Sequence, residues 1–171
     1  MNKGIKMAYG DLICMINSDD WFEPNALAFV NEEYEKNKSD FIYGDINIIK
    51  SNGHSFVKKS RVMKHYFTTR HWSHPSSFIS KNLYNKIGLY ENRTIYDDWD
   101  LVLRIFKSNA KISVVNKIIS NFSMNGVSHK KGFKAAFERA KLKYSIYRKN
   151  GYSRIYWFEC YFLEILKAII R

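Results

Sequence analysis

Two acidic clusters contain the residue types and spacing that can do chemistry in this chain. The first is Asp19 and Asp20 in "NSDD", which overlaps the end of the apolar run "LICMIN" at residues 12–17. The second is "YDDWD" at residues 96–100, which contains three aspartates. Paired carboxylates serve either as oxygen ligands for a hard divalent cation or as general bases that take a proton from a substrate. The sequence therefore offers candidates for both tasks.

The position of the first cluster favours a ligand site. The run at residues 12–17 is typical of a buried strand, which places Asp19 and Asp20 at its carboxyl end. Open α/β sheets bind ligands in the crevice beyond the carboxyl ends of their strands. A Mg²⁺ or Mn²⁺ ion there takes one or two carboxylates and completes its shell with phosphate oxygens and water. The alternative is that one of these aspartates only caps a helix opened by Pro24.

The second cluster also has a structural alternative. Asp97, Asp98 and Asp100 begin a helical pattern, and the helix dipole favours acidic residues at a helix N-terminus. Arg104 follows Asp100 by four residues, which is the spacing of an ordinary ion pair on a helix. Each cluster taken alone therefore fits a structural role as well as a chemical one.

The composition limits the class of protein. The chain has 171 residues, 46% hydrophobic and 16% aromatic, so it can bury a core and is expected to form one domain. A formal net charge of +12 predicts an anionic partner such as a phosphate, a nucleic acid or an acidic lipid. Nucleic-acid binding is not expected because no binding motif is present. Cys14 and Cys160 are isolated and indicate a reducing cytoplasm, and neither a signal peptide nor a spanning segment is recognised.

Strands and helices alternate around the two clusters. Strands are expected at residues 12–17, 40–49 and 112–122, and helices from Pro24 to residues 36–40, over 80–88, over about 97–109, and over about 131–149 and 153–170. Gly88 is expected to stop the helix over residues 80–88. This alternation predicts an α/β domain with some parallel pairing.

The order of the motifs resembles that of a known family. "NKGIKMAYGDLICMINSDDWFEPNAL" is followed by "DFIYGD", by "HPSSFISKNLYNKIGLYENRTIYDDWDLVLRIF" and by "NGVS". This order is similar to the second half of family 2 glycosyltransferases, the inverting, nucleotide-sugar-dependent enzymes of the GT-A fold. The resemblance implies a partial GT-A domain, Rossmann-like with a mixed sheet, over residues 1–129. Residues 130–171 are then a C-terminal helical extension of the same domain.

The resemblance implies a donor site at "NSDD". This segment matches the family's metal-binding DxD-type motif, in which the aspartate at the position of Asp19 binds the Mn²⁺ or Mg²⁺ that bridges the donor diphosphate. Asn17 stands where many members have the first aspartate. The donor side implied by the match consists of Asn17, Ser18, Asp19, Asp20, Lys3 and Gly4.

The resemblance places the catalytic base in the second cluster. The family's base lies in a motif of two acidic residues followed by an aromatic residue, an aspartate and a leucine, which matches Asp98, with Asp97 beside it. Asp98 would take the proton of an acceptor hydroxyl while that oxygen attacks the anomeric carbon from the face opposite the diphosphate. His74 and Trp99 fall on the acceptor side, although His74 alternatively only orders its loop.

The match gives supporting roles to Asp100, Arg104 and His129. Arg104 is expected to hold the acidic loop by pairing with Asp100 or Asp97. His129 follows "NGVS", which matches a family loop near the diphosphate. Lysines beside His129 are candidates to reach phosphate, but exposed lysines are usually only solvated.

The start of the chain departs from the family. Members usually begin with a strand, a helix and a second strand, and the match here begins after them, so we expect the chain to be N-terminally truncated relative to the family. The expected activity is inverting transfer of a sugar from a nucleotide-diphosphate sugar to a saccharide or lipid-linked acceptor, in cell-surface polysaccharide or glycan synthesis. The alternatives are an inactive remnant or an interaction domain that keeps the fold. A separate N-terminal chain and a homo-oligomer both stay open as partners.

The last segment, residues 153–171, is aromatic and aliphatic over most of its surface. It is expected either to pack on its own domain or to lie in a membrane interface, helped by basic residues such as Lys141, Lys143, Arg148 and Lys149. The expected location is the cytoplasm, with peripheral contact at the inner face of the cell membrane as the second option.

Overall fold

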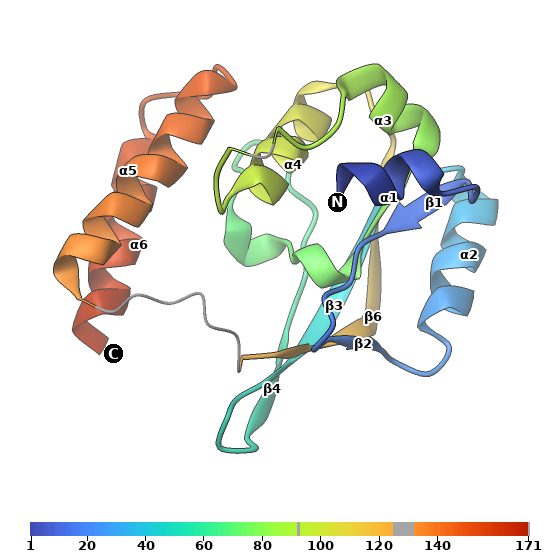
Figure 1. The fold of residues 1–171 in the computed structure, drawn as a ribbon, viewed down its shortest axis with the longest axis horizontal. Coiled ribbons are helices and arrows are strands. Elements are labelled where there is room, and N and C mark those ends of the chain that lie inside the picture. Colours follow the sequence, from blue (N-terminus) through green and yellow to red (C-terminus); the bar gives the residue numbers. More distant parts are fainter. Residues whose placement is uncertain (92, 125–131, 171) are drawn as a thin grey trace. The chain divides into compact units, whose positions relative to one another are not determined.

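The computed structural model describes residues 1–91, 93–124 and 132–170. The chain forms two compact units, Met1–Tyr90 with Ile105–Asn125, and Glu91–Arg104 with Gly126–Arg171. The first unit contains the sheet and the second contains the C-terminal helices (Figure 1). The acidic cluster at residues 97–100 belongs to the same unit as these helices, whereas the sequence pattern placed it with the transferase part.

The first unit is built on a six-stranded sheet with the path β1-β5-β3-β6-β2 and with β4 beside β3. The strands are β1 (Leu12–Cys14), β2 (Trp21–Phe22), β3 (Phe41–Ile49), β4 (Ser55–Lys58), β5 (Ser77–Ser80) and β6 (Ile112–Ser123). β3 and β6 are parallel, and the remaining described pairs are antiparallel. The predicted α/β class with a mixed sheet is confirmed.

Three strands end at one edge of this sheet. β5 is antiparallel to both β1 and β3, and β3 is parallel to β6, so β1, β3 and β6 run in the same direction. The segment that leaves β1 carries "NSDD" and continues into β2, which pairs with β6 at Ser120 and Asn121. The acidic turn therefore lies at the edge where α/β sheets place their ligands.

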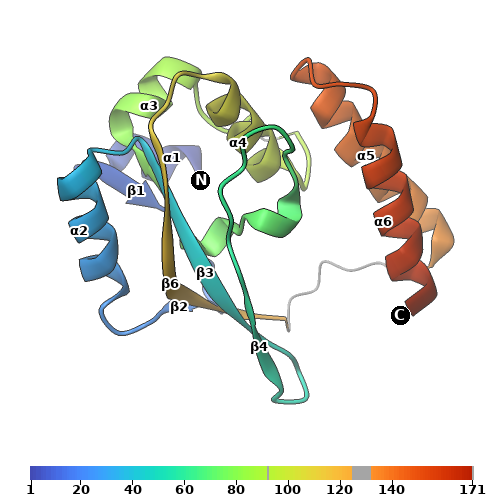
Figure 2. The ribbon, with the colours of Figure 1, turned by 180° about the vertical axis from the view of Figure 1, so that it is seen from behind.

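The helices are α1 (Asn2–Met7), α2 (Ala26–Asn37), α3 (Lys81–Ile87), α4 (Asp97–Lys107), α5 (Phe133–Lys149) and α6 (Tyr156–Ile170). α2 lies alongside the sheet (Figure 2) and packs on β6. The apolar cluster that joins them consists of Ala26, Val30, Ile42, Phe78, Val115 and Ile119. α3 begins at Ser80, whose hydroxyl accepts a 3.1 Å hydrogen bond from the amide of Leu83, and ends at Gly88 (φ 84°), as predicted.

Gly44 marks a close approach between β3 and β6. A β-carbon there would lie 2.4 Å from Ile119 Cγ1 and 3.0 Å from the carbonyl oxygen of Val115. The register of the two strands also shifts on either side of Asp45, which is the signature of a β-bulge. Glycine therefore fits this position because any side chain would push β6 away.

Some elements differ from the sequence prediction. α2 begins at Ala26 after Asn25, which has a left-handed backbone, so Pro24 lies in the preceding turn and does not open the helix. β1 ends at Cys14 instead of residue 17. α1 was not predicted, and it is held by Asn2, whose amide group exchanges hydrogen bonds of 2.7 and 3.1 Å with the backbone of Tyr90. Residues 2 and 90 are far apart in the sequence, so no local sequence pattern predicts this contact.

The second unit contains the predicted pair of C-terminal helices. α5 and α6 lie side by side and are joined through Gly151 (φ 68°) (Figure 1). The ring of Tyr147 stacks on that of Tyr156 with centroids 4.2 Å apart. The hydroxyl of Tyr152 donates a 2.9 Å hydrogen bond to the carbonyl of Leu103, which ties the pair to the first part of α4. In the described part of the chain, none of the helices has both the length and the apolar character needed to cross a membrane.

Candidate functional site

Residues 17–20 form a turn after β1 that Asp20 closes. Asp20 is 9% exposed, and its carboxylate accepts hydrogen bonds of 3.0 Å from the Ser123 amide and 3.0 Å from Asn17 Nδ2. Its own amide donates to the carbonyl of Asn17 at 3.2 Å. Asp20 therefore joins the turn to the end of β6. Neither aspartate of the cluster caps α2, whose N-cap is Asn25.

Asp19 has a different environment from its neighbour. Like Ser18, it is exposed, and it has no hydrogen-bond or ion-pair partner among residues 1–91, 93–124 and 132–170. Over the same ranges, no three His, Cys, Asp or Glu side chains gather to hold a metal by themselves. A single exposed carboxylate fits a hard cation that takes its other ligands from phosphate oxygens and water. Asp19 thus suits a metal shared with a bound diphosphate.

A second set of hydrogen bonds, made by polar side chains of β3 and β6, supports the turn. Asn121 Nδ2 donates to Glu23 Oε1 at 2.5 Å, and Asn47 Nδ2 donates to Asn121 Oδ1 at 2.9 Å. The Glu23 amide also donates to the carbonyl of Ile119 at 2.9 Å. These bonds fix the segment after "NSDD" on β6. Sequence analysis missed these residues, although an asparagine inside the apolar strand 40–49 was an available signal.

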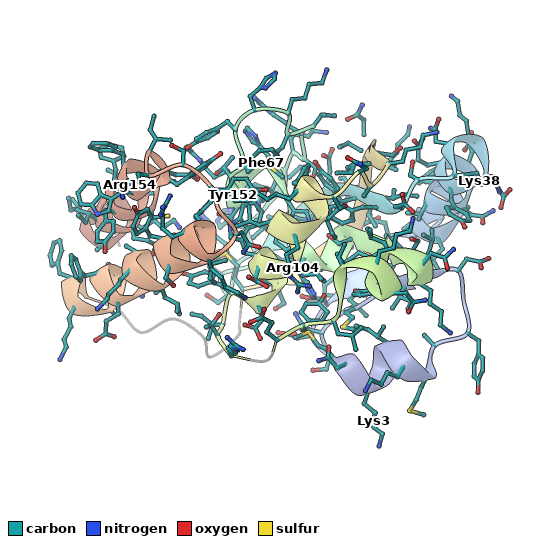
Figure 3. The ribbon with its side chains drawn as sticks, turned by 90° about the horizontal axis from the view of Figure 1, so that it is seen from above. Lys3, Lys38, Phe67, Arg104, Tyr152 and Arg154 are labelled. Carbon is teal, nitrogen blue, oxygen red and sulfur yellow. The ribbon has the colours of Figure 1, made fainter. Side chains whose placement is uncertain are left out.

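Lys3 and Gly4 lie on α1 and are exposed. The side chain of Lys3 points away from the helix (Figure 3). Within the described residues, neither forms a hydrogen bond or ion pair with the turn at residues 17–20, so their place in a donor site stays a prediction.

His74 is held in place by an aromatic neighbour and a hydroxyl. Its Nε2 lies 3.4 Å from the Tyr90 hydroxyl oxygen, and its ring stands edge-on to Trp72 with centroids 6.3 Å apart. Tyr90 is itself anchored by Asn2. These contacts support the alternative in which His74 orders its loop, and a contact with the acceptor stays a prediction.

Asp97 closes the loop before α4. Its side chain is 6% exposed and accepts hydrogen bonds from the Arg93 amide at 2.7 Å, from the Thr94 amide at 2.8 Å and from the Thr94 hydroxyl at 3.1 Å. Asp97 was predicted to lie with the catalytic residues. Both of its carboxylate oxygens bind the loop, which gives it a loop-closing role, and a catalytic contact stays a prediction.

Asp100 is the second engaged aspartate of this cluster. Its carboxylate accepts hydrogen bonds from Arg104 Nε at 3.1 Å, Lys149 Nζ at 3.0 Å and Asn150 Nδ2 at 2.8 Å. Burial alone would raise the pKa of the Asp100 carboxyl, but the bonds from Asn150 and Lys149 and the charge of Arg104 outweigh burial and lower this pKa. The ion pair predicted for Arg104 is therefore present, with Asp100 as its partner.

Asp98 is the most accessible aspartate of the three. It is half-buried, and its Oδ1 accepts a 2.7 Å hydrogen bond from the Trp99 amide. Trp99 itself is fully buried and packs edge-on against Tyr147, with centroids 5.9 Å apart. Trp99 therefore has a packing role in the second unit, and its predicted place on the acceptor side stays a prediction. His129 and "NGVS" lie outside the described residues.

Comparison with known proteins shows the family. The model of glycosyl transferase family 2 matches residues 1–104, which include both acidic clusters. The chain belongs to glycosyl transferase family 2. Divalent metals are common in enzymes of this family, which agrees with the exposed carboxylate of Asp19.

Relatives of this family 2 chain are known in bacteria. UDP-Gal:alpha-D-GlcNAc-diphosphoundecaprenol beta-1,3-galactosyltransferase of Escherichia coli is 23% identical over 165 residues, which cover 88% of this chain and 58% of that protein. Residues 1–349 of S. aureus TarS match with a TM-score of 0.54 and 16% identity, over 94% of this chain and 47% of that one. The same TarS fragment in complex with UDP-GlcNAc matches with a TM-score of 0.53 and 17% identity, over 87% of this chain and 44% of that one.

These matches agree on the fold. The mixed sheet with its helices is the α/β arrangement of the TarS glycosyltransferase domain, so the predicted GT-A class is confirmed. The chain spans about half the length of the relatives that it matches.

Proposed function

We propose that this chain is part of a glycosyltransferase that transfers a sugar, with inversion, from a nucleotide-diphosphate sugar to a saccharide or lipid-linked acceptor. The reaction would belong to cell-surface polysaccharide or glycan synthesis. One observation supports the proposal: each acidic cluster contains both buried and more exposed aspartates. Asp20, Asp97 and Asp100 are buried and hydrogen-bonded to the surrounding chain. Asp19 and Asp98 are the more exposed members. The three buried carboxylates position the turns, and the two more exposed ones are the proposed contacts for ligand and substrate.

On the donor side, Asp19 would bind Mn²⁺ or Mg²⁺ together with diphosphate oxygens. Such a metal, when bound, offsets the negative charge of the leaving diphosphate. Asp20 holds the turn against Ser123, which keeps the Asp19 backbone in one place. Asn17 and Ser18 lie in the same turn and complete the proposed donor contacts.

On the acceptor side, Asp98 would act as the general base. It accepts the proton of the acceptor hydroxyl while the new bond forms between that oxygen and the anomeric carbon. The bond from the anomeric carbon to the diphosphate oxygen breaks in the same displacement, and the nucleoside diphosphate leaves. Asp97 and Asp100 hold the loop and the helix start on either side of Asp98.

The names of the relatives support a choice of first substrates. The Escherichia coli relative is named for UDP-Gal and a GlcNAc-diphosphoundecaprenol, and TarS was crystallised with UDP and with UDP-GlcNAc. We therefore propose a UDP-sugar as donor and a lipid-linked sugar diphosphate as acceptor.

The test is acceptor-dependent release of UDP. The chain is incubated with Mn²⁺ and with UDP-Gal, UDP-GlcNAc or UDP-Glc, in the presence and absence of a lipid-linked GlcNAc diphosphate. Asp98→Asn should lower UDP release by at least about 100-fold, because a positioned base contributes on that scale. Asp11→Asn, which changes another exposed aspartate, is the matched control and should retain the rate. Near-normal release by Asp98→Asn would refute the assignment of the base, and no release by the folded wild-type chain would favour the inactive-remnant alternative.

We also propose a cytoplasmic location. Cys14 and Cys160 are free thiols, and burial raises the pKa of each to about 12, which keeps both protonated and unreactive. This state suits a reducing compartment.

A further inference from the structure

α6 exposes a continuous apolar stripe. Phe158 and Phe162 are each 67% exposed, and Ile169 is 66% exposed. The stripe consists of Phe158, Phe162, Ile165 and Ile169 on α6 and of Ile155 directly before it, which follow one another at intervals of three or four residues. That spacing places them on one side of the helix.

The polar side of α6 faces inward. Glu159 and Glu164 are 7% and 4% exposed, and Glu164 accepts a 2.9 Å ion-pair bond from Arg139 on α5. Lys143 of α5 is 2% exposed, and burial lowers the pKa of its amine while the charge of Glu159 acts in the opposite direction. Lys143 was expected to be one of the basic residues that help the last segment lie in a membrane interface, and its burial rules out that role. The side of α6 that packs on α5 therefore contains two carboxylates together with the ring of Tyr156, while Phe158, Phe162 and Ile169 face outward.

This orientation calls for an apolar environment outside α6. In most helix pairs the large apolar side chains face the partner helix and the charged ones face water. Here Phe158 and Phe162 are exposed, whereas Glu159 and Glu164 are buried. Contiguous apolar patches of this kind mark contact sites for proteins or membranes. The charges around the patch decide between them.

The segment around the stripe is basic. Residues 132–170 contain eight lysines and arginines and three glutamates. Lys134, Lys141, Arg148 and Arg154 are exposed, and Arg154 lies just before the start of α6 (Figure 3). Interfacial helices combine Phe, Trp and Leu on one side with Lys and Arg near anionic lipid headgroups. We propose that the α5–α6 pair docks on an anionic membrane surface through the apolar stripe of α6.

The length of α6 limits how it meets the bilayer. Its 15 residues extend about 22 Å, which is shorter than the roughly 30 Å of a hydrocarbon core. α6 therefore lies in the interface with Phe158 and Phe162 in the outer part of the acyl region. This inference is independent of the proposed reaction, because vesicle binding is measured without donor or acceptor.

The test is flotation of the full chain with lipid vesicles. Phosphatidylcholine vesicles with and without phosphatidylglycerol are compared at low and high salt. The double variant F158S/F162S removes two apolar contacts, and the matched control Y9S/L27S removes two exposed apolar side chains from the first unit. Circular dichroism checks that each variant is folded. K134Q/R154Q, which leaves the apolar stripe intact, tests the charges.

We expect wild type and Y9S/L27S to float with the anionic vesicles, and F158S/F162S to bind at least about tenfold more weakly. K134Q/R154Q should bind several-fold more weakly, and high salt should reduce wild-type binding. Equal binding by F158S/F162S and wild type, or no flotation of wild type, would overturn the proposal. A wild-type dimer that becomes a monomer in F158S/F162S without any flotation would assign the stripe to a second copy of the chain.

Discussion

The backbone amide of Ser123 donates a 3.0 Å hydrogen bond to the carboxylate of Asp20, which lies 103 residues earlier in the chain. This bond attaches the acidic turn to the end of β6 and leaves the neighbouring Asp19 exposed. In the second cluster, Asp97 closes its loop while Asp98 stays accessible. The buried member of each pair binds the surrounding chain, and the proposed ligand contacts belong to the more exposed member, so single substitutions can separate stability from activity.

Asp20→Ala should lower the free energy of unfolding by about 1–3 kcal/mol, because it leaves the Ser123 amide without its acceptor. Asp19→Ala should change it by less than about 0.5 kcal/mol, because the side chain is exposed. Urea unfolding followed by circular dichroism measures both values. Equal losses for the two variants would mean that Asp20 does not anchor the turn.

Asp97→Ala should destabilise the second unit by about 2 kcal/mol, because the Arg93 and Thr94 amides both lose their acceptor. Asp98→Asn should leave stability within about 0.5 kcal/mol of wild type, because it retains an acceptor oxygen for the Trp99 amide. Thermal unfolding of the two variants provides the comparison. A larger loss of stability in Asp98→Asn than in Asp97→Ala would contradict the loop-closing role of Asp97.

Asp100 should contribute to acid unfolding. Its pKa in the folded state is lower than the ordinary value of 3.8, so its carboxylate stabilises the fold at pH above 3.8 and loses this effect as the pH falls through the folded-state pKa. Asp100→Asn should therefore lower the free energy of unfolding at neutral pH and flatten its decline in acid. The measurement is urea unfolding at a series of pH values from about 7 to about 2. Parallel curves for the two proteins would contradict the pKa direction.

Gly44→Ala should destabilise the first unit by about 2 kcal/mol, because the new methyl group meets Ile119 and the carbonyl of Val115. Gly4→Ala is the matched control, since no atom lies within 4 Å of the added carbon on α1. It should raise stability by up to about 1 kcal/mol through helix propensity. Melting temperatures of both variants test this pair. A Gly44→Ala protein as stable as wild type would show that β6 shifts to make room for the methyl group without loss of stability.

Most of the local elements can be predicted from the sequence. Ser80 and Gly88 mark the two ends of α3, and the alternation of strands and helices predicts the mixed α/β class. Both acidic clusters were found because adjacent carboxylates next to a strand end or a helix start are visible in the sequence. The family resemblance adds the functional assignment of Asp19 and Asp98.

The division of work inside each cluster could not be predicted, because it depends on partners far away in the chain. Asp20 accepts a hydrogen bond from the Ser123 amide, and Asn121 donates one to Glu23 over a separation of 98 residues. The orientation of α6 is a further case: the side that faces α5 is shown by the buried Glu164 and its ion pair with Arg139, which the sequence of the helix alone does not reveal.

Calorimetric titration of this chain with UDP, with and without Mn²⁺, tests the proposed donor site most directly. UDP binding should require Mn²⁺, be lost in Asp19→Asn and be retained in Asp98→Asn, because Asp19 would hold the metal and Asp98 would serve only the acceptor. UDP binding that is unaffected by Mn²⁺, or that is undiminished in Asp19→Asn, would contradict the proposed donor site.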